Sequence, residues 1–140
     1  MPKSFLIKNQ SELKNIAKQV LTKKPKLLAL TGPLGAGKTT LARVIGKQLG
    51  IKQVLTSPTF VLEQVYQLPK NSHYQYLIHV DCYRMKSRAE LPALDLEHWL
   101  SQEKTLVIIE WADKIKSWLN KFKPTWIKIE VKDKTRKITL

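Results

Sequence analysis

Gly32-Pro33-Leu34-Gly35-Ala36-Gly37-Lys38-Thr39 is the stretch that decides the fold of this chain. It matches the pattern G-x-x-x-x-G-K-[ST], in which glycines let the backbone turn so that successive N–H groups face phosphate oxygens. The unbroken apolar run Leu27–Leu30 precedes it, as a strand buried on both faces requires. A helix predicted from about Lys38 to Leu49 follows, with Gly50 as its C-cap, and its positive end meets the same anion.

This loop predicts binding of ATP together with Mg²⁺. Lys38 has the reach and charge to contact the β and γ phosphates, and the Thr39 hydroxyl is placed for the metal. The alternative is a glycine turn without a ligand, which the flanking strand and helix disfavour.

Two acids follow apolar segments and are candidates for the metal and water side of the site. Asp81 ends the run Leu77–Val80, and Glu110 ends the run Leu106–Ile109. In a parallel sheet, the carboxyl ends of such strands open onto the crevice that holds the phosphate loop. Physical reasoning does not decide which acid contacts the metal, and each alone is also explained as a helix cap or a surface charge.

A polar loop is predicted after the phosphate-loop helix. It contains Thr56-Ser57-Pro58-Thr59-Phe60, whose hydroxyls beside a rigid proline suit a switch loop that senses the γ-phosphate. An ordinary polar loop before a strand explains its position equally well.

The remaining periodicity predicts one α/β domain over residues 1–140, with a P-loop NTPase-like parallel sheet core, helices on both faces and antiparallel strand additions. Asn9 and Glu12 predict a capping box before an amphipathic helix. Further predicted elements are strands at Ser4–Ile7 and Thr105–Ile109, hairpins of Val61–Leu68 with Tyr74–Val80 and of Trp126–Val131 with Arg136–Leu140, and helices at Leu91–Leu100 and about Ala112–Phe122.

Composition is ordinary for a globular protein, with 43% hydrophobic and 26% charged residues. No apolar run approaches the roughly 20 residues that span a bilayer. The first residues lack the pattern of a signal peptide, and the single cysteine, Cys82, forms no internal disulfide. We therefore expect no membrane association and a cytoplasmic location.

The net charge of +14 is concentrated at the two ends of the chain. Residues 1–26 carry seven basic side chains and one acid, and residues 114–140 carry nine basic and two acidic side chains. These segments fit either a basic face for nucleic acid or an acidic partner, or a merely solvated surface.

The set of motifs resembles the TsaE (YjeE) family. The resemblance rests on the loop Gly32–Thr40, on Ser57–Phe60, on the segment His79-Val80-Asp81-Cys82-Tyr83-Arg84 and on Ile109-Glu110-Trp111, in this order over about residues 5–138. It implies an ATPase needed for threonylcarbamoyl modification of adenosine 37 in tRNAs that read codons beginning with A. It also implies TsaD-like and TsaB-like partner proteins, with the transfer reaction left to those partners.

The resemblance also assigns roles to residues. The phosphates would be held by Leu34, Gly35, Ala36, Gly37, Lys38, Thr39 and Thr40, the metal by Thr39 and Glu110, and the switch loop would be Ser57, Pro58 and Thr59. Asp81 would be a catalytic or outer acid, and Trp111 would lie near the nucleotide. Base contacts would come from Gln10 and Thr135. Lys134-Thr135-Arg136 departs from the Gly-Arg pair that is common in the family.

Two alternatives use the same phosphate loop. A small P-loop kinase acting on a nucleoside or metabolite would need a lid with clustered arginines, whereas Arg43, Arg84, Arg88 and Arg136 are scattered in the sequence. A nucleotide-gated RNA-binding module would use the basic ends and would bind RNA alone in a salt-sensitive way.

Overall fold

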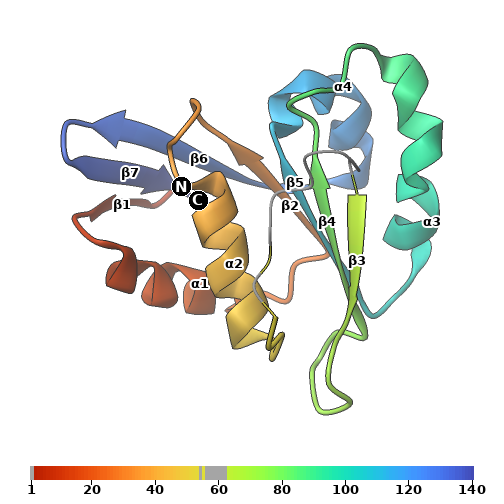
Figure 1. Cartoon of the computed structure of the whole chain (residues 1–140), viewed down its shortest axis with the longest axis horizontal. Coiled ribbons are helices and arrows are strands. Elements are labelled where there is room, and N and C mark those ends of the chain that lie inside the picture. The colour runs from red at the N-terminus through yellow and green to blue at the C-terminus, as the bar shows by residue number, and fades with distance from the viewer. Residues whose placement is uncertain (1, 54, 56–62) are drawn as a thin grey trace.

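The computed structural model describes residues 2–53, 55 and 63–140, which form a seven-stranded sheet in the order β1-β7-β6-β2-β5-β4-β3 (Figure 1). The strands are β1 (Ser4–Ile7), β2 (Leu27–Thr31), β3 (Glu63–Gln67), β4 (Tyr76–Asp81), β5 (Thr105–Glu110), β6 (Thr125–Lys132) and β7 (Thr135–Thr139). The α-helices are α1 (Leu13–Thr22), α2 (Lys38–Gln48), α3 (Leu96–Ser101) and α4 (Lys116–Leu119).

The centre of the sheet is parallel and its edges are antiparallel, which confirms the predicted fold class. Strand β2 pairs in parallel with β5 and β6, and β5 pairs in parallel with β4. Strands β3, β7 and β1 are added antiparallel. The two most apolar strands, β2 and β5, occupy the middle, where both faces are covered.

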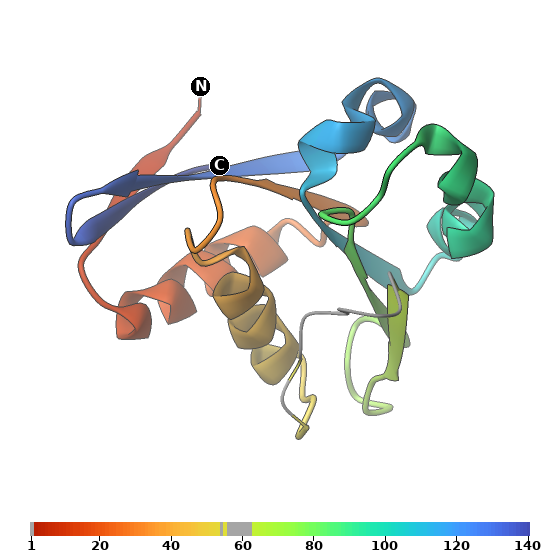
Figure 2. The ribbon, with the colours of Figure 1, turned by 45° about the horizontal axis from the view of Figure 1, so that its top comes forward.

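Helices cover both faces of the sheet, α1 and α2 on one and α3 and α4 on the other (Figure 2). Side chains in a strand alternate between faces, so Leu28 and Leu30 of β2 pack with α1 and α2, whereas Leu27 and Ala29 pack with α3 and α4. The continuous apolar runs in the sequence follow from this double covering.

Two predicted local details are wrong. The Asn9 side chain caps no helix: it accepts a hydrogen bond from the Ser11 hydroxyl, and the chain makes a 3-10 turn over Gln10–Glu12 before α1. The helix predicted at about 112–122 is divided into a 3-10 turn (Ala112–Ile115), α4 and a second 3-10 turn (Asn120–Phe122). The first turn has a 3-10 spacing that places buried Ala112 and Ile115 on the same side.

The region predicted as one or two short helices at Leu91–Leu100 contains a 3-10 helix (Arg88–Leu94) followed by α3. A capping box that sequence reasoning missed starts it: Ser87 accepts from Ala89 N–H, and Glu90 accepts from Ser87 N–H. None of the helices in the described ranges is long and apolar enough to cross a membrane.

Candidate functional site

The phosphate loop joins β2 to α2, and three of its glycines have backbone angles that other residues rarely adopt. Their φ values are +151° at Gly32, +77° at Gly35 and +111° at Gly37, which is the N-cap of α2. A Cβ atom on Gly32 would lie 2.5 Å from the carbonyl oxygen of Ile129 in β6. The loop therefore starts in close contact with the neighbouring strand and ends at the positive end of an eleven-residue helix.

Lys38 lies inside this loop and is only 4% exposed. Its Nζ donates to the carbonyl oxygens of Gly32 at 2.6 Å and Pro33 at 2.9 Å, and lies 4.0 Å from the ring centroid of Trp111. Burial lowers the pKa of Lys38 from its ordinary value, and the nearby carboxylates of Glu110, Asp81 and Asp113 act in the opposite direction. These acids offset part of the effect of burial.

Thr39 and Glu110 meet across 71 positions of sequence. The Thr39 hydroxyl donates to Glu110 Oε1 at 2.6 Å, and the other carboxylate oxygen, Oε2, lies 2.6 Å from Nε2 of the fully buried His79. This brings together the two residues predicted to hold the metal. His79 was not predicted to take part.

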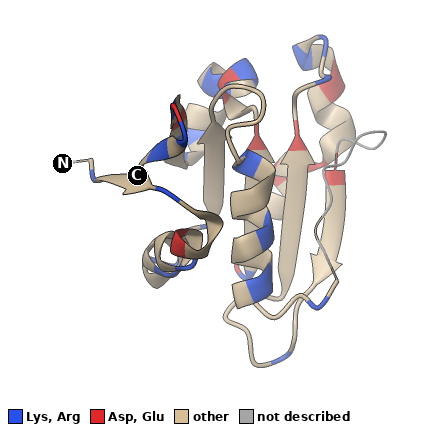
Figure 3. Ribbon diagram, turned by 60° about the vertical axis from the view of Figure 1, so that its left-hand side comes forward, with Lys and Arg blue, Asp and Glu red and all other residues tan. Residues whose placement is uncertain are grey.

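Asp81 ends β4 beside the end of β5, directly opposite Glu110 in the strand register. Its Oδ1 accepts the backbone N–H of Tyr83 at 2.8 Å, which fixes the carboxylate at the turn after the strand. Figure 3 shows the two acidic strand ends as red tips beside the blue start of a helix. The prediction that both acids would face the phosphate loop at one edge of the sheet matches this arrangement.

A cavity of about 270 Å³ lies between the loop and these strand ends. Its wall includes Leu34, Lys38, Thr39, Asp81, Glu110 and Trp111. The backbone of Trp111 has a left-handed conformation with φ of 57°. The centroid of its ring lies 4.9 Å from the ring centroid of Tyr83. The predicted position of Trp111 near a nucleotide fits this wall.

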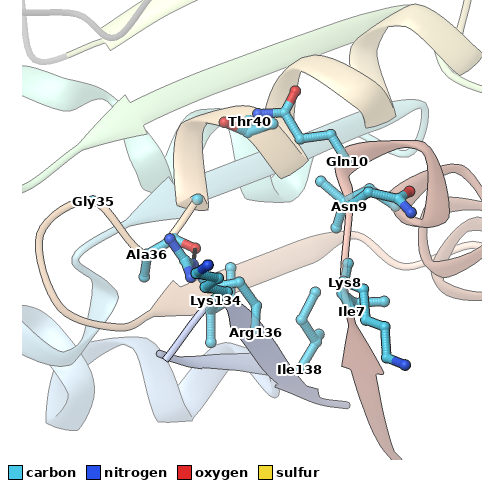
Figure 4. Close-up of a pocket in the computed structure, with 13 residues that line it drawn as sticks. Ile7, Lys8, Asn9, Gln10, Gly35, Ala36, Thr40, Lys134, Arg136 and Ile138 are labelled. Carbon is cyan, nitrogen blue, oxygen red and sulfur yellow. Dashed lines mark hydrogen bonds between the residues drawn. The ribbon is translucent and has the colours of Figure 1, made fainter. Parts of the chain in front are cut away.

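A second cavity, of about 220 Å³, lies on the other side of the loop (Figure 4). Asn9 and Gln10 line one side, and Lys134 and Arg136 line the other. Arg136 Nε also donates to the Ala36 carbonyl at 3.1 Å, which ties β7 to the phosphate loop. Gly35, Gly37 and Thr40 border both cavities, so the loop connects them.

The predicted base contacts are placed unequally. Gln10 lines the second cavity, whereas Thr135 is not among its lining residues and donates its hydroxyl to the Lys132 carbonyl at 2.7 Å. The neighbours Lys134 and Arg136 line it instead. The base contact assigned to Thr135 stays a prediction.

The predicted switch residues Ser57, Pro58 and Thr59 lie outside the described residues. Just before them, Leu55 is buried and its carbonyl oxygen accepts from Arg43 Nε of α2 at 2.5 Å. The switch role of this loop also stays a prediction.

Sequence reasoning missed His79, Tyr83 and Arg136 as parts of the site. His79 stands in an apolar run, where a histidine is ordinarily a core residue. Two signals were available for His79: its place in the motif His79–Arg84 and the alternation of β4, which puts His79 and Asp81 on the same face of the strand.

Comparisons with known proteins identify a family and a fold. The family profile described as "Threonylcarbamoyl adenosine biosynthesis protein TsaE" matches residues 7–138. A Streptomyces coelicolor protein named tRNA threonylcarbamoyladenosine biosynthesis protein TsaE is 42% identical over 88 residues, covering 62% of this chain and 57% of the relative. A Bacillus subtilis protein of the same name is 37% identical over 113 residues, covering 79% of this chain and 67% of the relative.

The structure is similar to the crystal structure of Bacillus subtilis YdiB, with a TM-score of 0.76 and 29% sequence identity. The likeness covers 99% of this chain and 84% of that one. The sequence matches to the Streptomyces coelicolor and Mycobacterium tuberculosis relatives span 57% and 54% of those proteins, slightly more than half their lengths.

Proposed function

The chain belongs to the TsaE family, and on this premise we propose that it is a Mg²⁺-dependent ATPase required for threonylcarbamoyl modification of tRNA. The modified position would be adenosine 37 in tRNAs that read codons beginning with A. The observation that carries this proposal is the pair of cavities joined by the phosphate loop, with Thr39 and Glu110 in contact at one of them. A nucleotide laid across the loop would place its phosphates and its base in different cavities.

The residues present fit a magnesium ion. Thr39 and Glu110 supply a hydroxyl and a carboxylate 2.6 Å apart on the cavity wall. Oxygen atoms of this kind are the ligands Mg²⁺ prefers, with substrate phosphates completing the set. When bound, the ion would neutralise charge on the phosphates during hydrolysis.

The chain's own residues would then bind and orient the nucleotide. The backbone from Leu34 to Thr40 would cradle the phosphates, and Lys38 would balance the negative charge between β and γ. Asp81 faces the same cavity from the neighbouring strand and would orient the attacking water. The indole of Trp111 would exclude solvent from this side.

The second cavity would hold the base and ribose. Gln10 offers both an amide donor and an acceptor there, as base edges require. Arg136 would couple occupancy of this cavity to the loop through its hydrogen bond to Ala36. We keep Thr135 as a further candidate contact from the same hairpin.

The transfer reaction belongs, in this proposal, to TsaD-like and TsaB-like partners. Both cavities at the loop are taken up by parts of one nucleotide, so hydrolysis would serve a conformational change that a partner senses. Ser57, Pro58 and Thr59 would be the switch loop that carries it. A tRNA substrate would place the protein in the cytoplasm.

Reconstitution of tRNA modification tests the proposal. Purified chain, both partners, tRNA and threonylcarbamoyl-adenylate are mixed with and without ATP. We expect repeated rounds of modification only with this chain and ATP, and loss of the effect in Lys38→Ala. Equal turnover without the chain would refute the proposal, and efficient phosphorylation of a small molecule by the chain alone would favour the kinase alternative.

A further inference from the structure

We propose that His79 is a positioning residue for nucleotide-dependent metal binding: its imidazole holds one oxygen of Glu110 so that the other faces Thr39. The inference rests on the proposed function, because it concerns how the chain prepares its magnesium site. His79 would touch neither nucleotide nor metal and would act only through Glu110.

The geometry gives each carboxylate oxygen its own partner. His79 Nε2 lies 2.6 Å from Oε2, and Thr39 Oγ1 lies 2.6 Å from Oε1. One partner belongs to strand β4 and the other to helix α2, so the carboxylate plane is fixed between two rigid elements. Rotation about the last side-chain bond of Glu110 would break both hydrogen bonds.

Strand register explains why these side chains meet. His79 is opposite Ile108 in the parallel pair β4–β5, and Glu110 is two residues beyond Ile108. Residues two apart in a strand point to the same face, so His79 and Glu110 both lie on the face covered by α2. Thr39 is in the first turn of that helix.

A purely structural pair is the competing explanation, and the surroundings argue against it. His79 and Glu110 are 0% and 2% exposed, and the residues between the ends of β4 and β5 are otherwise apolar. Burying an imidazole and a carboxylate is costly, and apolar side chains of similar volume would stabilise such a core at least as well. Conversely, a carboxylate held in one orientation by its outer hydrogen bonds is a common arrangement around metal ligands.

The other imidazole nitrogen indicates which tautomer holds Glu110. Among the described residues, the buried His79 Nδ1 has no hydrogen-bond partner. A hydrogen on Nδ1 would be buried without an acceptor, whereas a hydrogen on Nε2 is donated to the carboxylate. We therefore place a ring hydrogen on Nε2, where it is donated to Glu110.

The first test measures the Mg²⁺ concentration that is required for nucleotide binding. A fluorescent ADP analogue is titrated at a series of Mg²⁺ concentrations and in excess chelator, with His79→Leu, His79→Gln and the parent. We expect His79→Leu to raise the required Mg²⁺ concentration about 10-fold or more. In excess chelator, its affinity for the nucleotide should stay within about twofold of that of the parent. His79→Gln carries an amide N–H with nearly the reach of Nε2, so it should recover most of the loss.

Thr105→Val is the matched control, because Thr105 is 1% exposed at the opposite end of β5 from Glu110. It changes a buried polar group without touching the site, and its Mg²⁺ requirement should equal that of the parent. An unchanged requirement in His79→Leu would overturn the inference. The inference would also be overturned, in favour of a structural role, if both His79 variants lost nucleotide affinity equally and lost it in excess chelator as well.

The second test needs neither metal nor nucleotide. Nitrogen-15 NMR of the histidine rings in the free protein should show His79 with its hydrogen on Nε2, exchanging slowly with water, and Glu110→Ala should speed that exchange. A ring that carries its only hydrogen on Nδ1 would refute the inference even if His79→Leu fails to fold. A parent that binds nucleotide without any Mg²⁺ dependence would instead refute the proposed metal-dependent function, and the NMR result would still judge His79.

Discussion

The side chain of Lys38 is held in the site by contacts with its own loop. Its ammonium group contacts two loop carbonyls and the face of Trp111, and it is nearly inaccessible to solvent. A cation confined to this position has lost its conformational freedom during folding rather than on binding phosphate, so more of its interaction energy remains for the ligand.

Lys38→Ala should therefore weaken binding of an ATP analogue by about 10- to 100-fold, as loss of charge-assisted hydrogen bonds of 1.5–3 kcal/mol implies. Thr39→Ala should weaken binding in Mg²⁺ more than binding in chelator. Equilibrium titration measures both effects. Lys47→Ala, on the exposed last turn of the same helix, is the control and should bind like the parent; unchanged affinity in Lys38→Ala would refute the loop assignment.

Glu110→Gln and Asp81→Asn should reduce hydrolysis more than they reduce stability, because each keeps the shape of a side chain that borders the cavity. We expect ATP hydrolysis to fall about 10-fold or more in Glu110→Gln, since a bound metal supplies several kcal/mol of charge stabilisation. Phosphate release with the partners present gives the rate, and urea unfolding gives the stability. If both variants hydrolyse ATP at the rate of the parent, Asp81 and Glu110 take no part in hydrolysis.

At the residue scale, the sequence predicted the groups that a local pattern defines. Lys38 and Thr39 follow from the loop motif, and Asp81 and Glu110 from their positions at the ends of apolar runs. The link from Thr39 through Glu110 to His79 was not predictable, because it depends on which strands are neighbours and in which register. The left-handed backbone of Trp111 was likewise invisible, since tryptophan has no preference for that conformation.

At the scale of elements, buried segments with strong periodicity were predicted and short irregular ones were not. Strands β2 and β5 form at continuous apolar runs, and helices α1 and α2 form at apolar stripes of helical period. The division of 112–122 into three short pieces was missed because each piece is shaped by packing against the sheet rather than by its own propensity. Strand order was beyond reach for a similar reason: β6 lies beside β2, although the two are far apart in sequence.

The junction of β2 with β6 yields a prediction about stability. Gly32→Ala would place a Cβ atom 2.5 Å from the Ile129 carbonyl oxygen, so the loop or β6 must shift. Gly35→Ala also has a positive φ, of +77°, but meets nothing within 4 Å, so it serves as the control for backbone strain without a steric contact. Urea unfolding should show a loss of about 1–2 kcal/mol for Gly35→Ala from backbone strain and a distinctly larger loss for Gly32→Ala. Equal losses would mean that contact with β6 is unimportant.

The carboxyl group of Glu63 in strand β3 should make the stability of the protein depend on pH. Burial and then the charge of Asp95 raise the pKa of Glu63 to about 7, against a hydrogen bond from Trp99. The folded state therefore holds this proton more tightly than the unfolded chain, whose value is near 4.5. Protonation of Glu63 therefore stabilises the folded state fully below about pH 4.5, and this stabilisation is lost as the pH rises towards about 7.

Glu63→Gln should remove this dependence. Relative to the parent, the variant should gain about 1 kcal/mol of unfolding free energy between pH 4.5 and pH 8, a figure reduced for partial exposure of the group. Chemical denaturation of both proteins across that range measures the difference. Glu97→Gln, at an exposed position of α3, should show no such trend; a constant offset between Glu63→Gln and the parent would contradict the assignment.

At the scale of the whole molecule, folding brings the basic N-terminal segment and the basic hairpin β6–β7 into one half of the sheet. Strand β1 pairs with β7, and β7 pairs with β6, while α1 covers the same half. Exposed lysines in this half include Lys3, Lys8, Lys14, Lys18, Lys128 and Lys132. Lys14 and Lys18 lie on α1, which covers one face of this half, whereas Lys128 and Lys132 alternate with Ile127 and Ile129 and so project from the other face. The charges that are far apart in sequence thus lie in one half of the fold, on both of its faces.

This region predicts salt-sensitive binding of tRNA when the chain is combined with its partner proteins, whereas strong binding by the chain alone is the outcome expected of the RNA-binding alternative. Each lysine that contacts a phosphate contributes about one unit to the slope of log affinity against log salt concentration. Lys14→Gln with Lys18→Gln should lower the slope, measured by fluorescence anisotropy over a salt series. Lys70→Gln with Lys104→Gln, exposed in the other half, is the control. Affinity that does not change with salt would identify the lysines as a merely solvated surface.

The pairing of β1 with β7 also sets the order of events while a ribosome makes the protein. Ser4 and Thr139 hydrogen-bond across 135 positions, and the backbone N–H of Leu140 reaches the Lys3 carbonyl. At 5–20 residues per second, β1 emerges on the order of ten seconds before its partner strand has been synthesised. For that interval the nascent strand has an open hydrogen-bonding edge and half-formed apolar contacts, so the newborn chain is exposed to misassociation until strand β7 leaves the exit tunnel.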